Sequence, residues 1–127
     1  MLNKIGKLKK LTILFVDDEV EIIEIISDTL KKLEVNFFVA YNGKEALRIL
    51  NSHHIDLLIT DINMPVMDGI KLIENIRKDG NDLNCIIMSA YTEKKYKQMA
   101  DELNVKEYIT KPFDFIEFLD VVNNKII

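Results

Sequence analysis

The fold class is decided by IDLLIT at residues 55–60, which is followed at once by DINMPVMDG at residues 61–69. The first segment is a mainly apolar run that predicts a buried strand. The second begins with the carboxylate of Asp61 and continues as a loop interrupted by Pro65 and Gly69. Open α/β sheets place their chemistry at the carboxyl ends of their strands, so Asp61 is a candidate functional residue.

Three other apolar runs also end in polar side chains. Because the carboxyl ends of parallel strands meet at one edge of a sheet, we expect these side chains to lie close to Asp61. Acids, a hydroxyl and an ammonium at one edge indicate a site for a divalent cation and a phosphoryl group. The runs and their polar residues are 11–16 with Asp17 and Asp18, 83–88 with Ser89, and 105–109 with Lys111.

Strand-like and helix-like segments alternate five times along the chain. Between the apolar runs, apolar residues recur at helical spacing, as do Ile22, Ile26 and Leu30 within residues 19–33. Strict alternation predicts an α/β fold with a parallel five-stranded sheet, right-handed crossovers and helices on both faces. The expected strands are 11–16, 35–40, 55–60, 83–88 and 105–109, and the expected helices are 19–33, 43–50, 69–77 (or from 67), 92–103 and 113–126.

Length, charge and cysteine content narrow the class of protein. The chain has 127 residues and fits one domain; its net charge of −4 argues against direct nucleic-acid binding, which normally requires a basic face. The single cysteine, Cys85, lies in an apolar run, where a buried small side chain is expected. No apolar stretch approaches the roughly 20 residues of a membrane span, and no signal-peptide pattern occurs, so a cytoplasmic protein without membrane association is predicted.

The first ten residues differ in composition from the rest. They contain four lysines and little apolar material. We therefore expect a flexible basic leader over residues 1–10 and a single domain over residues 11–127.

The adjacent carboxylates of Asp17 and Asp18 repel each other and raise a pKa unless a cation neutralises them. Mg²⁺ (or Mn²⁺) needs only one or two carboxylates and leaves room for phosphate oxygens, with Asp61 as third acid and the Asn63 carbonyl as a further ligand. A carboxylate beside such an ion can attack phosphorus and become an aspartyl phosphate. Each residue also has a simpler interpretation: acids that favour a helix dipole, a surface lysine, a turn serine.

These residues carry a resemblance to a known family. From Thr12 to Ile126 the chain resembles the receiver domains of two-component response regulators, chemotaxis regulators included. The resemblance implies a flavodoxin-like doubly wound (βα)5 fold with strand order 2-1-3-4-5. The matching segments are FVDDE at 15–19, the run 61–69, MSA at 88–90 and YITKPF at 108–113.

The resemblance also implies roles for individual residues. Asp61 is expected to be the phosphoacceptor, and Ser89 and Lys111 to contact the phosphoryl group. Ser89 and Tyr108 are expected to form the conformational switch, and the Lys111–Pro112 peptide to be cis. The implied Mg²⁺ ligands are Asp18, Asp61 and the Asn63 carbonyl, with Asp17 helping directly or through water; Asn63 and Tyr91 occupy positions that tune the lifetime of the phosphate.

The expected partners follow from the same family. A sensor histidine kinase or histidine phosphotransfer protein supplies the phosphoryl group, and the downstream effector is unknown. The last helix carries more apolar residues than one core contact needs, namely Ile116, Val121 and Ile127. This excess indicates either a partner face, such as a homodimer through segment 92–127, or merely sticky C-terminal residues. The first helix, with extra apolar residues Ile22 and Ile25, is expected to help dock the donor or to be more deeply buried than usual.

Three other functions share part of this pattern. A phosphatase of the haloacid dehalogenase type also uses an aspartyl phosphate, but it needs a second acid where this chain has Asn63. A flavodoxin-like carrier would need a phosphate-binding loop where Asp17 and Asp18 would repel the phosphate. A pseudo-receiver would lack at least one chemical residue. We therefore expect no conventional enzyme, only Mg²⁺-dependent self-phosphorylation from a phosphohistidine donor and autodephosphorylation.

Overall fold

The computed structural model describes residues 2–90, 94–105, 107–112 and 114–123, with side chains from Ile5 onward. Tyr91, Phe113 and residues 124–127 lie outside the described residues. In the described residues, five strands and five helices alternate after an additional N-terminal helix. The strands are β1 (Thr12–Val16), β2 (Asn36–Ala40), β3 (Leu57–Thr60), β4 (Asn84–Ser89) and β5 (Glu107–Thr110); the helices are α1 (Leu2–Leu8), α2 (Val20–Lys32), α3 (Gly43–Ser52), α4 (Gly69–Lys78), α5 (Lys94–Glu102) and α6 (Phe115–Val121).

All strand pairs are parallel, and the sheet order is β2-β1-β3-β4-β5. The α/β class, the five strands and the 2-1-3-4-5 order predicted from the sequence are therefore confirmed. Parallel strands must be covered on both faces, which is why β1, β3 and β4 are buried almost throughout.

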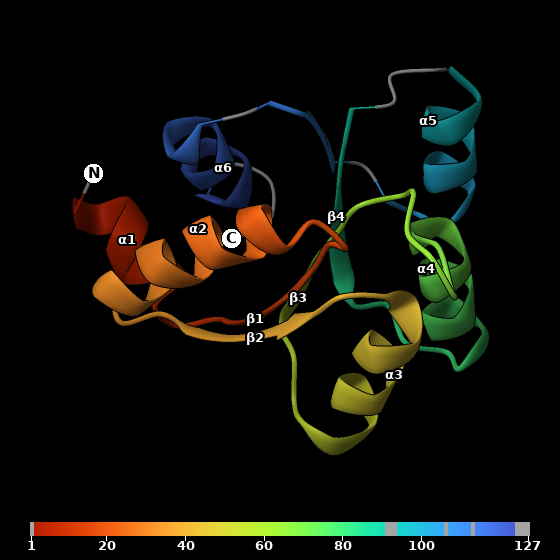
Figure 1. Ribbon diagram of the computed structural model, residues 1–127, viewed down its shortest axis with the longest axis horizontal. Coiled ribbons are helices and arrows are strands. Elements are labelled where there is room, and N and C mark those ends of the chain that lie inside the picture. The colour runs from red at the N-terminus through yellow and green to blue at the C-terminus, as the bar shows by residue number, and fades with distance from the viewer. Residues whose placement is uncertain (1, 91–93, 106, 113, 124–127) are drawn as a thin grey trace.

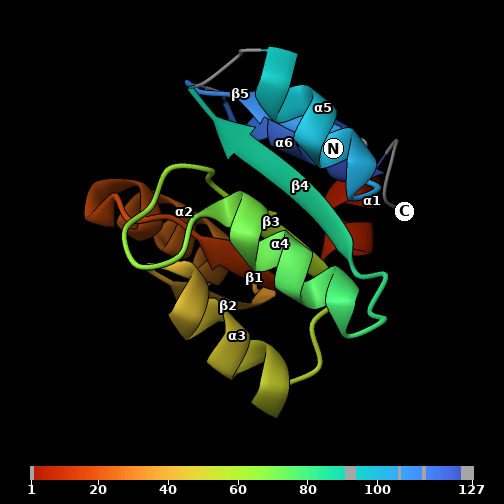
Figure 2. The ribbon, with the colours of Figure 1, turned by 90° about the vertical axis from the view of Figure 1, so that its right-hand side faces the viewer.

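Helices form a layer on each side of the sheet, as Figures 1 and 2 show. On one side, α3, α4 and α5 pack through residues such as Ala46, Ile73 and Ala100. On the other side, α1, α2 and α6 pack through Leu8, Ile23 and Phe118. None of the described helices combines the length and apolar composition needed to cross a bilayer.

The N-terminal segment differs from the flexible leader expected. Leu2–Leu8 form α1, which packs against α6. Leu8 is fully buried and Ile5 packs against the same core cluster, whereas the neighbouring Lys7 and Lys9 are exposed. The lysines conceal a short amphipathic pattern in the sequence, and burial of Leu8 stabilises the helix despite its length.

The sheet register brings the ends of β1 and β3 together. Val16 pairs with Ala40 on one side and with Thr60 on the other. The next residues continue the ladder, since the Asp61 N–H donates to the Val16 carbonyl at 3.0 Å. Asp17 and Asp61 consequently lie side by side at the carboxyl edge of the sheet.

Candidate functional site

Two carboxylates at this edge are buried. Asp17 is 0% exposed and Asp61 is 6% exposed. In each carboxylate, one oxygen is held by a backbone amide. Asp17 Oδ1 accepts from the Glu19 N–H at 2.9 Å, and Asp61 Oδ1 accepts from the Ile62 N–H at 2.8 Å. The Oδ2 atom of each carboxylate therefore remains available for a cation.

Lys111 supplies that cation from the end of β5. Its Nζ lies 2.7 Å from Asp17 Oδ2 and 3.2 Å from Asp61 Oδ2. It also lies 3.3 Å from Glu19 Oε1. The register places Lys111 here because Thr110 pairs with Ser89, and the Lys111 N–H donates to the Ser89 carbonyl at 2.9 Å. One ammonium thus faces three carboxylates.

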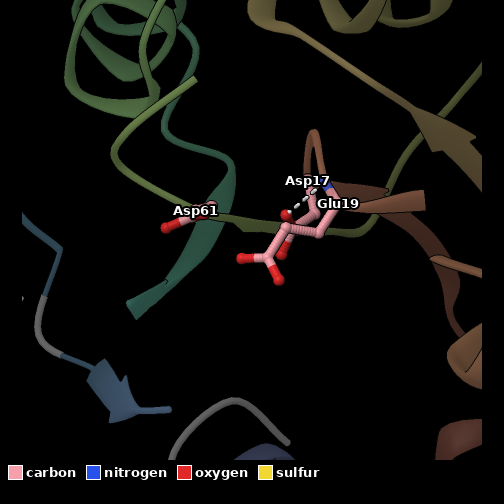
Figure 3. Close-up of side chains that lie close together, drawn as sticks. All are labelled: Asp17, Glu19 and Asp61. Atoms are coloured by element: carbon pink, nitrogen blue, oxygen red, sulfur yellow. Dashed lines mark hydrogen bonds between the residues drawn. The ribbon is translucent and has the colours of Figure 1, made fainter. Parts of the chain in front are cut away.

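Glu19 is a site residue that sequence reasoning missed. Carboxylate oxygens of Asp17, Glu19 and Asp61 all lie within 4.8 Å of one another. Figure 3 shows Asp17 and Glu19 together on the segment after β1 and Asp61 at the end of β3. The sequence offers one signal for it, since Glu19 directly follows the two acids, but its long side chain could equally have pointed into solvent.

Asp18 and Asn63, both predicted as metal ligands, line the neighbouring pocket. This pocket has a volume of about 280 Å³ and is bounded by Asp18, Glu19, Asp61, Asn63, Ala90 and Lys111. Asp18 is exposed, but its charge is close enough to contribute to raising the pKa of Asp61. The structure therefore brings Asp18 and Asp61 to one pocket, which Glu19 also lines, and holds Asp17 beside it through Lys111.

The electrostatics of the pocket favour a cation. Burial raises the pKa of the Asp61 carboxyl, although Lys111 opposes the shift. Burial likewise raises the pKa of Asp17 against the hydrogen bond from Lys111. For Lys111, burial acts to lower the pKa, but the hydrogen bond and charge of Asp17 outweigh it and the pKa is raised. Three carboxylates face the single ammonium group of Lys111, so part of the negative charge of the site is not neutralised.

The donor set fits a small hard cation. Two oxygens on opposite sides of Mg²⁺ lie about 4.2 Å apart, because each bond is about 2.1 Å long. The carboxylate oxygens of Asp17, Glu19 and Asp61 lie within 4.8 Å of one another, so small side-chain shifts bring them to this separation. An all-oxygen set of this kind suits Mg²⁺ or Mn²⁺.

Ser89 and Tyr108 lie on adjacent strands. Ser89 ends β4 and is fully buried. Tyr108, on β5, is half-buried against the core formed with α3, α4 and α5, and Lys97 Nζ lies 5.5 Å from the centre of its ring. Ser89 thus lies at the carboxyl edge of the sheet, and Tyr108 lies on the α5 side of the neighbouring strand.

Two features of the backbone, one at each residue, accompany Asp61 and Lys111: a close contact with Gly69 and a cis peptide bond. The Lys111–Pro112 peptide is cis, as the resemblance implied. Gly69, at the start of α4, packs so closely on Asp61 that an added Cβ would collide with the Asp61 carbonyl oxygen. The Gly69 N–H also donates to the Ile62 carbonyl at 2.8 Å, which closes the loop between these two residues.

Comparison with known proteins places this geometry in a family. The model of the response regulator receiver domain matches residues 13–123. Sporulation initiation phosphotransferase F of Bacillus subtilis (strain 168) is 34% identical over 110 residues, covering 87% of this chain and 89% of that protein. Response regulator GtcR of Aneurinibacillus migulanus is 37% identical over 106 residues, covering 84% of this chain and 43% of that protein.

Solved structures of response regulators have a fold similar to that of this chain. The response regulator protein TrrA from Thermotoga maritima, in complex with Mg²⁺ and BeF, has a TM-score of 0.78 and 33% identity, covering 90% of this chain and 97% of that one. The receiver domain of the Francisella response regulator 1452 has a TM-score of 0.81 and 32% identity, covering 90% and 94%. The chain therefore belongs to the receiver domains of two-component response regulators. It spans about two fifths of GtcR and of the probable transcriptional regulator ycf27 of Cyanidium caldarium.

Proposed function

We propose that Asp61 is the phosphoacceptor of this receiver domain and takes its phosphoryl group from a phosphohistidine donor. The observation that carries the proposal is the buried Asp61 carboxylate, with Oδ2 paired to Lys111 beside a second buried acid, Asp17. Oδ1 is held by the Ile62 amide, so Oδ2 is the oxygen aimed at the pocket.

Transfer of the phosphoryl group to Asp61 requires no reagent other than the phosphohistidine donor. The Asp61 oxygen attacks phosphorus and forms a P–O bond while the P–N bond of phosphohistidine breaks. The donor ring, protonated at its other nitrogen, takes that electron pair and leaves as neutral imidazole. Lys111 then pairs with a phosphoryl oxygen in place of Asp61. Loss of the signal is hydrolysis, in which water attacks the phosphorus and Asp61 leaves as carboxylate. We expect no other catalysis from this domain.

The proposed metal ligands are Asp17, Asp18, Asp61 and the backbone carbonyl of Asn63. A bound Mg²⁺, or Mn²⁺ in its place, neutralises charge on the transferred oxygens. The pocket lined by Asp18, Asp61 and Asn63 supports this assignment. Glu19 competes with Asp17 and Asp61 for Lys111, and its exposed position favours that role over direct ligation.

The proposed switch runs from Ser89 to Tyr108. The Ser89 hydroxyl moves toward the phosphoryl group, and the Tyr108 ring occupies the space that this movement creates. The half-buried state of Tyr108 supports the idea, because an inward turn would bury ring surface that is now exposed. Phosphorylation then biases a two-state equilibrium that a partner reads on β5 and α5.

The donor is proposed to dock in a groove beside the phosphorylation pocket. The groove lies between α2 and the start of α6 and has a volume of about 510 Å³. Glu19, Ala90 and Lys111 border both cavities, so a helix seated in the groove presents a histidine to Asp61. Ile25 is 66% exposed at its rim, where an apolar residue is unfavourable unless a partner covers it. The donor class is a sensor histidine kinase or a histidine phosphotransfer protein, acting in the cytoplasm.

A second copy of the chain is the proposed partner for the face formed by segment 92–127. Ile116 on α6 is 48% exposed and Met99 on α5 is 39% exposed, which supports an apolar contact there. Gel filtration with and without Mg²⁺ and beryllofluoride tests it. A larger apparent mass with beryllofluoride is expected, and a monomer in both states would remove the homodimer.

The central experiment is phosphorylation with acetyl phosphate and Mg²⁺, followed by intact-protein mass spectrometry and by tyrosine fluorescence with beryllofluoride. We expect the parent protein to gain one phosphoryl group and Asp61→Asn to gain none. Asp79→Asn, which alters an exposed acid at the end of α4, is the control and keeps the parent response. Equal labelling of Asp61→Asn and the parent would overturn the assignment.

A further inference from the structure

Arg77 joins three separate parts of the chain. It lies in the last turn of α4, and its guanidinium contacts the loop before β4, the start of β4 and the end of α5. Nε donates to the Leu103 carbonyl at 2.8 Å, and Nη1 donates to the carbonyls of Leu83 at 2.8 Å and Asn81 at 3.0 Å. Nη2 lies 3.8 Å from the Cys85 sulfur. The cation therefore binds mainly backbone carbonyl oxygens.

The contact with Leu103 falls at the C-terminal end of α5, which ends at Glu102. Carbonyls at a helix end lack partners within the helix and carry partial negative charge, so a cation there stabilises the end. A guanidinium suits this position because its planar donors can serve several carbonyls at once, whereas a lysine ammonium acts as a single point charge.

Helix α5 is otherwise weakly and unevenly attached. Its buried residue is Ala100, in the second half, and Val105 just beyond the helix is also buried. In the first half, Lys94, Lys95 and Lys97 are exposed, and Tyr96 packs against the core but is only half-buried. The buried residues and the Arg77 hydrogen bond therefore act on the same end of the helix. Figure 1 shows α5 next to α4, the helix that carries Arg77.

We propose that Arg77 is a positioning residue that anchors the C-terminal end of α5, so that this helix moves about a fixed far end. The part about movement rests on the proposed switching through Ser89 and Tyr108. The first half of α5 is the end closer in sequence to Ser89, and Lys97 in that half contacts the Tyr108 ring. A response to phosphorylation is then confined to the first half, while Ala100 to Leu103 stay in place.

Hydrogen exchange of the backbone amides tests the anchor in the free protein, without any phosphorylation. In Arg77→Met we expect exchange in residues 100–105 to rise by about tenfold or more, the amount expected when hydrogen bonds from a charged donor are lost. Amides of β1 and β3 serve as internal references for global stability. Arg77→Lys, the variant less prone to misfold, should give an intermediate rise, and Arg48→Met, which alters the exposed arginine of α3, should give none.

The proposed movement of α5 about its fixed C-terminal end, the pivot, is tested by repeating the hydrogen-exchange measurement with Mg²⁺ and beryllofluoride. In the parent protein, exchange should change in residues 94–99 and not in residues 100–103; in Arg77→Met both halves should change. Unaltered exchange of 100–105 in free Arg77→Met, or a rise shared equally by β1 and β3, would overturn the anchor. Equal changes in both halves of parent α5 would overturn the pivot, and failure of beryllofluoride to bind at all would count against the proposed function instead.

Discussion

Lys111 lies closer to Asp17 than to Asp61: Nζ is 2.7 Å from Asp17 Oδ2 and 3.2 Å from Asp61 Oδ2. Asp17 is also the more deeply buried of the two acids. Lys111 is therefore held mainly by Asp17. Exchanging its contact with Asp61 for a phosphoryl oxygen costs less interaction energy than giving up its contact with Asp17. The pairing keeps the ammonium in place before and after the proposed transfer.

Replacing Lys111 by methionine should destabilise the protein in the absence of divalent cations. The change leaves two buried carboxylates without their cation, and breaking a buried ion pair costs about 3 kcal/mol or more. Added Mg²⁺ should restore part of this stability, because it supplies positive charge to the same carboxylates. Denaturant unfolding near neutral pH, with and without Mg²⁺, measures both effects.

Lys71→Met is the matched control, since Lys71 is exposed and pairs only loosely with Glu74 at 4.0 Å. It should change stability by less than about 0.5 kcal/mol. A Lys111→Met protein as stable as this control would mean that the carboxylates do not depend on Lys111.

Asp61→Asn should stabilise the metal-free protein near neutral pH. Burial raises the pKa of Asp61 in the folded state, so the folded protein binds this proton more tightly than the unfolded chain does. Ionisation of Asp61 therefore costs stability as the pH rises above the ordinary value of 3.8. Removing the charge should raise the Tm by about 2–4 °C.

The gain in Asp61→Asn should shrink as the pH is lowered from neutral toward the ordinary value of 3.8, because the folded parent carboxyl, with its raised pKa, takes up its proton before the unfolded chain does. Thermal unfolding followed by circular dichroism across this pH range, in the presence of a chelator, gives the comparison. A gain that grows on acidification would contradict the direction of the pKa shift.

Asp18 and Glu19 should differ in their effect on metal affinity. Both line the pocket with Asp61 and Asn63, but the Glu19 carboxylate is paired with Lys111. Asp18→Asn should weaken Mg²⁺ binding by about tenfold or more, and Glu19→Gln by less than about threefold, since losing a ligand removes more free energy than losing a nearby charge. Isothermal titration calorimetry measures both; the reverse order would make Glu19 the ligand.

Gly69→Ala should disturb the site directly. The new methyl group would collide with the Asp61 carbonyl oxygen, so the backbone carrying the proposed phosphoacceptor must shift. We expect a loss of about 3 kcal/mol in stability and slower labelling by acetyl phosphate. Gly6→Ala is the control: an added Cβ there meets nothing within 4 Å, and alanine favours α1 by up to about 1 kcal/mol.

Val66→Asn should stabilise the loop after Asp61. Val66 has φ of 70° and is 76% exposed. A β-branched residue in the left-handed region is strained by about 1–2 kcal/mol, and asparagine tolerates that region better. Denaturant unfolding should show a gain of about 1 kcal/mol, while Val20→Asn in the first turn of α2 should show none; equal responses would rule out backbone strain as the cause.

Much of the fold could be predicted from local patterns. The strands β1, β3 and β4 are continuous apolar runs and the helices have apolar residues at helical spacing, so element type and order followed directly. Strand ends agreed within a residue or two, because the polar residues Asp17, Asp61 and Ser89 interrupt the runs where the strands stop. The convergence of Asp17, Asp61 and Lys111 followed from the parallel sheet alone.

The sequence by itself determined the alternation of strands and helices, and hence which polar residues share one edge of the sheet, because hydrophobic periodicity is a local property. Only the tertiary structure decided which side chains pair across that edge and which surface residues become core. Glu19 reaches Lys111 across 92 positions of sequence, and Leu8 becomes fully buried only because α6 packs beside it. Such long-range contacts depend on side-chain reach and on the relative placement of whole elements, which no local pattern encodes.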